Sequence, residues 1–276
     1  MAVAVGTASS ELKAAVEAPS RWQGHVLGIQ TAFQPIRRLD TLAVVGYEAL
    51  LRIVDRCCRK PIAVPEWIAA YKVEGGTEAL GHAERWWWTH HLQRAAGLGA
   101  PGGRWLFLNA EPRTLLGQDL AGLGGDGQGW GRRVVVEVTE RERETLTRSE
   151  WDAVGRAIRA QGWQVALDDW DLLAGDWSAI EGLAPNWIKI PAPALSGVRG
   201  DEDAARARVA ALATGGIRVV MEGIADADVL QSARALAVPF GQGYFLGRPR
   251  PISDGSASPR KGSSGAWGPG KGSHRV

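Results

Sequence analysis

The chain has 276 residues, 45% hydrophobic and 22% charged, which is the balance of an ordinary globular protein long enough to bury a sizeable core. The formal net charge is +2, but positions 250–276 carry +4 and leave −2 for the rest. This balance gives no support to a DNA-binding protein that works through a broad basic face. The sequence contains no run of 18 or more apolar residues, so it predicts no membrane span.

The first 24 residues are expected to form an extension, with one short amphipathic helical stretch at 10–16 before Pro19 and Gly24. They lack the basic start and sustained apolar stretch of a signal peptide. The two cysteines, Cys57 and Cys58, are adjacent, so their only intramolecular disulfide would be a strained vicinal bridge. We therefore expect a reducing, cytoplasmic setting.

Short apolar runs alternate with longer helix-patterned segments between residues 25 and 252. The eight runs are VLGIQTAF, LAVVGYEALL, RWLFLN, RVVVEVTE, WQVALDD, NWIKIP, IRVVMEG and FGQGYFLG. This alternation indicates βα units and a mainly parallel sheet. Eight units over about 230 residues favour a single (β/α)8 TIM-like barrel. An open doubly wound sheet is the alternative, although no G-x-G-x-x-G turn follows an early strand.

The last segment, 253–276, is a mixture of Gly, Ser and Pro with few apolar residues, so we expect a disordered basic tail.

Six of the eight runs place polar residues late, inside the run or directly after it. These residues are Glu48, Asn109, Glu137, Asp168 with Asp169, Lys189 and Glu222. Taken singly, each acid could be a helix cap or a surface ion pair. The carboxyl ends of parallel barrel strands meet at one mouth, so the pattern predicts one shared acidic site. Alternation along VVVEVTE points Glu137 into that mouth together with Val135.

The five acids of this set could not all ionise at neutral pH without cations. Oxygen donors without Cys or His favour Mg²⁺ or Mn²⁺ over Zn²⁺. The adjacent Asp168 and Asp169 suggest a ligand that bridges two ions, the arrangement used to hydrolyse phosphate esters.

These motifs, in this order, resemble the EAL-domain family of cyclic-di-GMP phosphodiesterases. The similarity extends from about Gln30 to Pro251, with Glu48-Ala49-Leu50 as the naming tripeptide. LFLNAEP, VEVTE, LDD, IKI, MEG and GQGYFLGRP are similar to the family's later motifs. The implied fold is the EAL-type barrel, and the implied reaction is hydrolysis of cyclic-di-GMP to linear pGpG.

The resemblance also implies a role for each matched residue. Glu48, Asn109, Glu137 and Asp168 would hold one metal ion, while Asp168 and Asp169 reach a second. Lys189 would orient the nucleophilic water, and Glu222 would bind metal or accept a proton. The positions that match substrate contacts are Gln34, Arg52 and Gln242.

One loop departs from the family pattern. The stretch from Asp168 to Trp177, DDWDLLAGDW, stands where the family usually has DDFGTGYSSL, and Glu140 matches the residue that anchors this loop. The residues Leu172 and Leu173 would restrict a loop that normally needs backbone freedom. A catalytically degenerate domain that binds cyclic-di-GMP or a protein without turnover is therefore the alternative.

Trp is unusually frequent, with 13 copies against 4 Phe and 3 Tyr. Three of them, Trp86, Trp87 and Trp88, are consecutive in a helix-like segment and span nearly a full turn. At least one of the three should reach an exposed side, where a homodimer contact is one role left open.

Overall fold

The computed structural model describes most of the region between the two chain ends, namely residues 19–22, 27–98, 103–116, 120, 130–139, 146–175, 177–192 and 201–252. The amphipathic stretch expected at 10–16 and the tail expected at 253–276 lie outside these residues.

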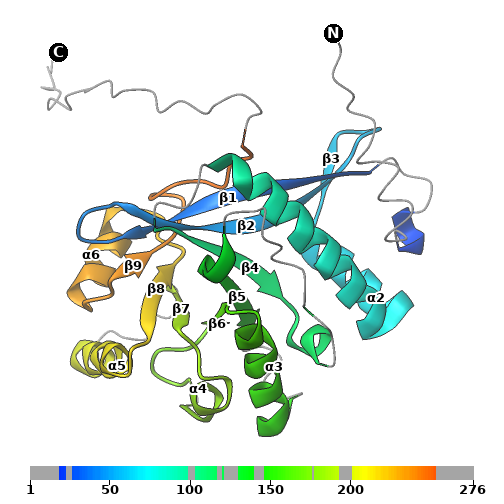
Figure 1. Cartoon of the computed structure of the whole chain (residues 1–276). Helices are drawn as coiled ribbons and strands as arrows, with labels where there is room; N and C mark the ends of the chain where they lie inside the picture. Colours follow the sequence, from blue (N-terminus) through cyan, green and yellow to red (C-terminus); the bar gives the residue numbers. More distant parts are fainter. Residues whose placement is uncertain are drawn as a thin grey trace, which may run out of the picture.

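Eight strands form a closed barrel, as the spacing of the apolar runs predicts (Figure 1). They are β1 (Leu27–Arg38), β2 (Val44–Asp55), β4 (Trp105–Ala110), β5 (Val134–Thr139), β6 (Gln164–Asp168), β7 (Trp187–Pro191), β8 (Arg218–Glu222) and β9 (Phe240–Gly241). Strand β1 pairs with both β2 and β9, and this closes the ring. The open doubly wound alternative is therefore wrong.

The first strand differs from the expected βα pattern. β1 runs antiparallel to both of its neighbours, and a tight turn, not a helix, joins it to β2. In that turn the N–H of Arg38 donates to the carbonyl of Ala43, and Leu42 has a φ of 59°. Apolar periodicity reports which faces of a strand are buried and carries no strand direction, so it could not reveal this reversal.

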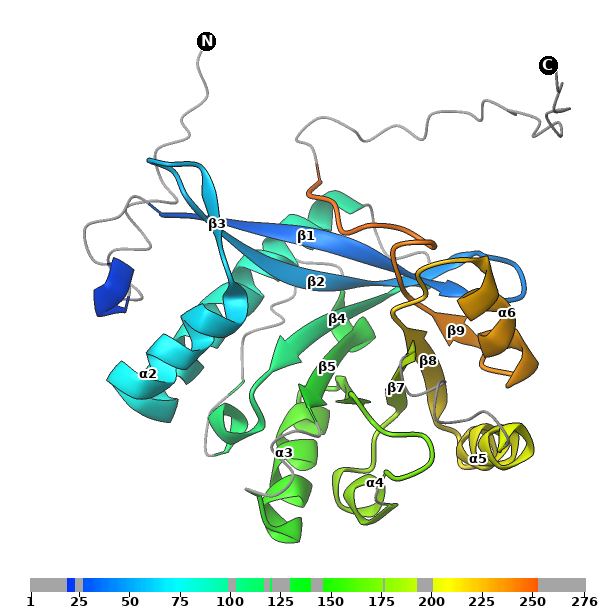
Figure 2. The ribbon, with the colours of Figure 1, turned by 180° about the vertical axis from the view of Figure 1, so that it is seen from behind.

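The β1–β2 hairpin is much longer than the barrel wall. Only residues 46–49 of β2 pair with β4, so the outer half of the hairpin projects past the barrel and carries β3 (Lys60–Ile62) at its far end (Figure 2). Because β2 is parallel to β4, this projection stands on the side where the parallel strands end.

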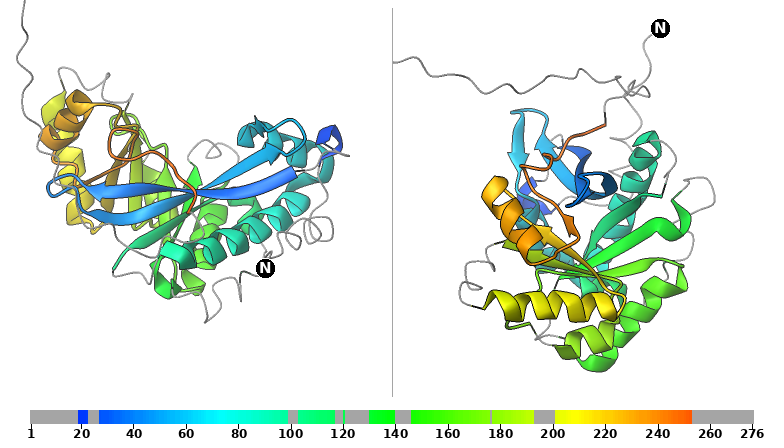
Figure 3. Two further views of the ribbon diagram at one scale, coloured as in Figure 1. Left: turned by 90° about the horizontal axis from the view of Figure 1, so that it is seen from above. Right: turned by 90° about the vertical axis from the view of Figure 1, so that its left-hand side faces the viewer.

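Helices surround the ring of strands (Figure 3). They are α2 (Val64–Ala95), α3 (Arg148–Ala160), α4 (Trp177–Leu183), α5 (Glu202–Thr214) and α6 (Ala227–Ala235), with short 3-10 turns η1 (Ser20–Trp22), η2 (Ala96–Leu98), η3 (Pro112–Leu115) and η4 (Gly131–Arg133). Local sequence sets several boundaries: Thr147 and Glu150 form a capping box at α3, and Asp226 caps α6. Gly76, with a φ of 67°, kinks α2.

Side chains divide between the two sides of the barrel wall by simple alternation. Inside the barrel lies a compact core of Ile36, Phe107, Val135, Ala166, Trp187 and Val220. On β5 the intervening Val134, Val136 and Val138 belong instead to the larger core under the helices. This two-residue period places Glu137 on the inner side with Val135.

Much of the Trp excess fills the helix-facing cores. Trp22, Trp67, Tyr71 and Trp87 pack in sequence between the projecting hairpin and α2, with ring centroids 4.9 to 6.2 Å apart. Trp87 and Trp88 are buried, and Trp86 is half-buried and stacked on His90. The described end of the N-terminal extension is thus held by Trp22 against Trp67 of α2.

Candidate active site

A buried lysine stands at the centre of the predicted acidic site. Lys189 of β7 places its Nζ 2.6 Å from Glu222 Oε1 and 2.8 Å from Glu137 Oε1. Glu48 Oε2 and Asp168 Oδ1 are at 3.5 and 3.8 Å. Four strands therefore bring four carboxylates around one ammonium group, as the convergence of parallel strand ends at one barrel mouth dictates.

Burial decides which of these groups ionise. Glu137 is fully buried, and its burial, together with the nearby carboxylates, raises its pKa well above the usual range despite Lys189. Burial also disfavours the charged form of Glu48, yet Lys189 and hydrogen bonds from Asn109 and Gln242 outweigh it and lower the pKa of that carboxyl. The cluster thus keeps Glu48 ionised and holds a proton elsewhere.

The other two members of the cluster follow the same physics. Burial and the carboxylates of Asp168 and Glu48 raise the pKa of Glu222 to about 8, although Lys189 opposes the shift. Burial alone would favour the neutral amine of Lys189. The surrounding carboxylates outweigh this effect and raise the pKa of Lys189 well above the ordinary value. One cation is too few for the acids gathered here.

A cation of higher charge fits these residues. Oxygens of Asp168, Asp169 and Glu222 lie within 4.8 Å of one another, close enough to share one ion. Within the described part of the chain, the buried Glu137 Oε2 and Asp168 Oδ1 have no hydrogen-bond partner, although both are strong acceptors. The donor set consists of oxygens, which suits Mg²⁺, Mn²⁺ or Ca²⁺.

Amide side chains orient the carboxylate of Glu48. Asn109 Nδ2 donates to Glu48 Oε1 at 2.9 Å, and Gln242 Nε2 donates to Glu48 Oε2 at 2.5 Å. Gln242 also donates to Gln34 Oε1 at 3.1 Å, and Gln34 donates to the carbonyl of Gly247. Gln242, predicted to contact substrate, is therefore bonded directly to Glu48, predicted to hold metal, and Gln34 is linked to Glu48 through Gln242.

A pocket of about 280 Å³ opens over this network. It is lined by Gln34, Glu48, Leu50, Glu222, Gly223, Ala225, Gln242, Gly243 and Tyr244. Tyr244, which sequence reasoning missed as a site residue, is 59% exposed and stacks under the guanidinium of Arg248. Its position in GQGYFLGRP, directly after Gln242 and Gly243, is the signal that could have identified it.

One predicted residue, Arg52, is not part of this cluster. Arg52 lies on the hairpin projection, four residues beyond Glu48 on the same face of β2, and its Nη1 donates to the carbonyl of Leu51. Glu140 lies outside the described residues.

Two side chains of the altered loop anchor its described part in the core. Trp170 and Leu172 are fully buried, and the main-chain N–H of Trp170 donates to the carbonyl of Lys189 at 3.0 Å. Asp171 Oδ1 accepts the N–H groups of Leu173 and Ala174, each at 2.8 Å. The loop is thus closed by its own hydrogen bonds beside the acidic cluster, and Asp169 at its start has a φ of 56°.

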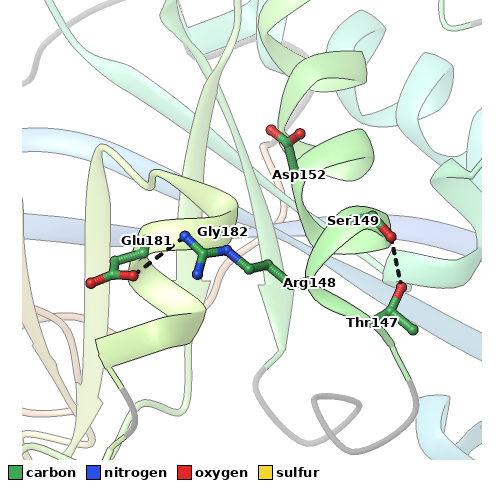
Figure 4. A pocket seen from close by; sticks show the side chains of 6 residues that line it. All are labelled: Thr147, Arg148, Ser149, Asp152, Glu181 and Gly182. Atoms are coloured by element: carbon green, nitrogen blue, oxygen red, sulfur yellow. Dashed lines mark hydrogen bonds and ion pairs between the residues drawn. The ribbon is translucent and has the colours of Figure 1, made fainter.

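A second, larger hollow lies on the surface between α3 and α4 (Figure 4). Its volume is about 680 Å³, and it is lined by Thr147, Arg148, Ser149, Asp152, Glu181 and Gly182. Arg148 pairs with Glu181 at 3.4 Å, and Asp152 pairs with Arg156. These exposed ion pairs give the hollow the chemistry of a solvated surface.

The sequence model of the EAL domain matches residues 25–249. The chain belongs to the EAL-domain family. No curated protein matches it, and no helix in the described part of this EAL domain is long and apolar enough to cross a membrane.

Solved structures agree on the fold. The EAL domain of FimX from Pseudomonas aeruginosa, solved bound to c-di-GMP, is 18% identical with a TM-score of 0.65, covering 80% of this chain and 90% of its own. The Bacillus subtilis protein YkuI, solved with c-di-GMP and calcium, is 20% identical with a TM-score of 0.67, covering 82% and 56%. The EAL enzyme Bd1971, solved with cAMP and cyclic-di-GMP, is 18% identical with a TM-score of 0.64. This chain covers 62% of that protein's length, so it spans only part of such relatives.

Proposed function

We propose that this EAL domain is a metal-dependent phosphodiesterase that hydrolyses cyclic-di-GMP to linear pGpG. The observation that carries the proposal is the contact of Lys189 with the carboxylates of Glu137 and Glu222 beside the pocket. A receptor that only binds a nucleotide gains nothing from a buried ammonium group among carboxylates, whereas a hydrolase needs groups that hold water and take its proton.

The charge of the site supports a cation requirement. Cyclic-di-GMP carries two phosphodiester charges, and the pocket beside Glu48 and Glu222 is itself acidic. Divalent ions reverse that local charge and allow a doubly anionic ligand to approach. Arg52, on the projecting hairpin above the mouth, would pair with a phosphate through its guanidinium fork.

The residues that would hold two ions, Mg²⁺ or Mn²⁺, divide into two sets. Glu48, Asn109, Glu137 and Asp168 form the first, and Asp168 and Asp169 contribute to the second. When bound, such ions supply an activated water and stabilise the charge that develops on the phosphate.

The chain's own residues then divide the remaining work. Lys189 orients the water from the floor of the site, because its ammonium group is fixed by four carboxylates. Glu222 completes the ion set or accepts the proton of the water. Gln34 and Gln242 border the pocket, where they order Glu48 and contact the nucleotide.

The test is release of pGpG from cyclic-di-GMP by the full chain with Mg²⁺ or Mn²⁺. We expect turnover that EDTA abolishes and that the Glu48→Ala variant lacks. Turnover no greater than that of Glu48→Ala would rule out the phosphodiesterase, and hydrolysis that survives EDTA would rule out the metal assignment.

The packed loop favours a second candidate, a receptor that binds cyclic-di-GMP or a protein without turnover. Leu172 and Trp170 are fully buried where a mobile loop would have to move. Tight cyclic-di-GMP binding by an inactive sample, measured by calorimetry, would favour this receptor.

Three expectations accompany the proposal. The family match supports a domain over 25–252, with segments 1–24 and 253–276 outside it. Cys57 and Cys58 are exposed and unpaired, in keeping with a cytoplasmic setting. A homodimer contact at the half-buried Trp86 stays a prediction, to be checked by sedimentation of the purified chain.

A further inference from the structure

Helix α2 holds the end of strand β4 from outside the barrel. The indole Nε1 of Trp88, a residue only 2% exposed, donates to the main-chain carbonyl of Asn109 at 2.9 Å. The ring itself is fixed, because it meets Trp163 edge-on with centroids 6.1 Å apart. A buried indole N–H needs an acceptor, and here the acceptor belongs to a residue of the acidic site.

The position of Asn109 matters for that site. It pairs in register with Glu137 on β5, and its side-chain amide donates to Glu48 Oε1 at 2.9 Å. Its main chain therefore connects the barrel wall to the amide group that holds the carboxylate of Glu48. A shift of that carbonyl would move the amide relative to the carboxylates.

A second contact from the same helix restrains the next residues. The buried carboxyl of Glu84 accepts the N–H of Glu111 at 2.8 Å and the hydroxyl of Thr114. Trp88 and Glu84 lie one helical turn apart, so α2 forms hydrogen bonds with the chain both before and after the end of β4.

We propose that Trp88 is a positioning residue for Asn109, and that its indole N–H sets where the Asn109 amide stands in the cation site. The inference rests on the proposed function in that the site binds a divalent cation. It adds a residue from the helical layer that touches neither cation nor substrate. Outer partners of metal ligands commonly change metal affinity by about 10- to 100-fold.

A matched control lies next to it in the chain. Trp87 is also buried, but it packs edge-on against Tyr71 in the aromatic group between the hairpin and α2, a group that includes no residue of β4. Trp88→Phe and Trp87→Phe each remove one indole from α2, and only the first removes the contact with Asn109.

The experiment is titration of the metal-free full chain with Mn²⁺, followed by electron paramagnetic resonance of the free ion. We expect Trp88→Phe to weaken binding about 10-fold and Trp87→Phe to change it less than about 2-fold, as for an interaction outside the network. In an Asn109→Ala background, Trp88→Phe should have no further effect, because its influence passes through Asn109. Trp88→Leu, which also lacks the donor, should repeat this coupling, and thermal melts confirm folding of each variant.

Two results would overturn the inference while leaving the proposed cation site intact. One is wild-type Mn²⁺ affinity in Trp88→Phe. The other is an equal loss of Mn²⁺ affinity on Trp88→Phe in the wild-type and the Asn109→Ala backgrounds. Failure of the wild-type chain to bind Mn²⁺ would instead overturn the metal-dependent function, and this inference with it.

Discussion

Lys189 and Glu137 are in direct contact at the buried floor of the barrel mouth, with Nζ and Oε1 2.8 Å apart and side chains 1% and 0% exposed. Burying the ammonium group of Lys189 costs solvation, so its charge depends on the carboxyl groups around it. The pair also lies under Glu48, Asp168 and Glu222, which share the same ammonium group.

Replacing Lys189 by Met should therefore destabilise the metal-free chain by about 3–5 kcal/mol, the usual consequence of leaving a buried charge unpaired. Saturating Mn²⁺ should restore part of that loss, because a cation would again face the carboxylates. Urea unfolding with and without Mn²⁺ measures both effects. The same variant should lose pGpG release by at least about 100-fold, as expected for a water-orienting group.

The control is Lys72→Met. Lys72 pairs with Glu111 at 2.7 Å, but its side chain is 40% exposed, so its loss should cost at most about 1 kcal/mol. Equal destabilisation by the two substitutions would contradict the special role of burial at Lys189.

Divalent cations should stabilise the wild-type chain more at pH 8 than at pH 6. The pKa of Glu222 is raised to about 8, so between about pH 4.5 and 8 the folded metal-free chain binds a proton that the unfolded chain has released. Its stability therefore falls as pH rises through this window. Protons also compete with metal at the carboxylates, so Mn²⁺ should stabilise the folded chain most at the pH where this proton is lost. Calorimetric melting temperatures with Mn²⁺ or EDTA test this, and a larger gain at pH 6 would contradict it.

Glu84 gives a pH effect independent of the cation site. Burial raises its pKa to about 8, although Thr114 and the N–H of Glu111 favour the charged form. Its raised pKa likewise lowers wild-type stability above about pH 4.5. Glu84→Gln removes that titration, so its stability relative to wild type should improve by about 3 kcal/mol from pH 5.5 to 8.5. Glu181→Gln, at an exposed ion pair, should show no such trend in chemical denaturation at the two pH values.

Substitution of Gly175 tests whether the close packing around Trp170 contributes to stability. A Cβ there would lie 2.3 Å from the carbonyl of Asp171 and 2.4 Å from the ring of Trp170, so Gly175→Ala must displace the loop. We expect a loss of about 1–3 kcal/mol and faster proteolysis near residue 175. Gly215→Ala, whose added Cβ would make only ordinary contacts at 3.4 Å or more, is the control. An unchanged melting temperature in Gly175→Ala would show that the loop is not rigid.

Local sequence was enough to predict the barrel and the residues that lie at its mouth. The eight apolar runs correspond to the eight barrel strands, because burial on both faces of a barrel strand leaves a continuous apolar segment, whichever way the strand runs. Polar residues late in these runs collect at one end because parallel strands share a direction. Glu48, Asn109, Glu137, Asp168, Lys189 and Glu222 could be found in this way without any coordinates.

Tertiary structure decided what periodicity cannot express. The reversed direction of β1, the hairpin projection that carries Arg52, and the packed loop around Trp170 depend on contacts between distant segments. Lys189 acquires four carboxylate neighbours, and Trp88 reaches Asn109, only when separate strands and helices close together. A sequence records which side chains turn inward along each element, but the charge state of Glu137 and the partner of Trp88 are set by distances that the closed barrel alone fixes.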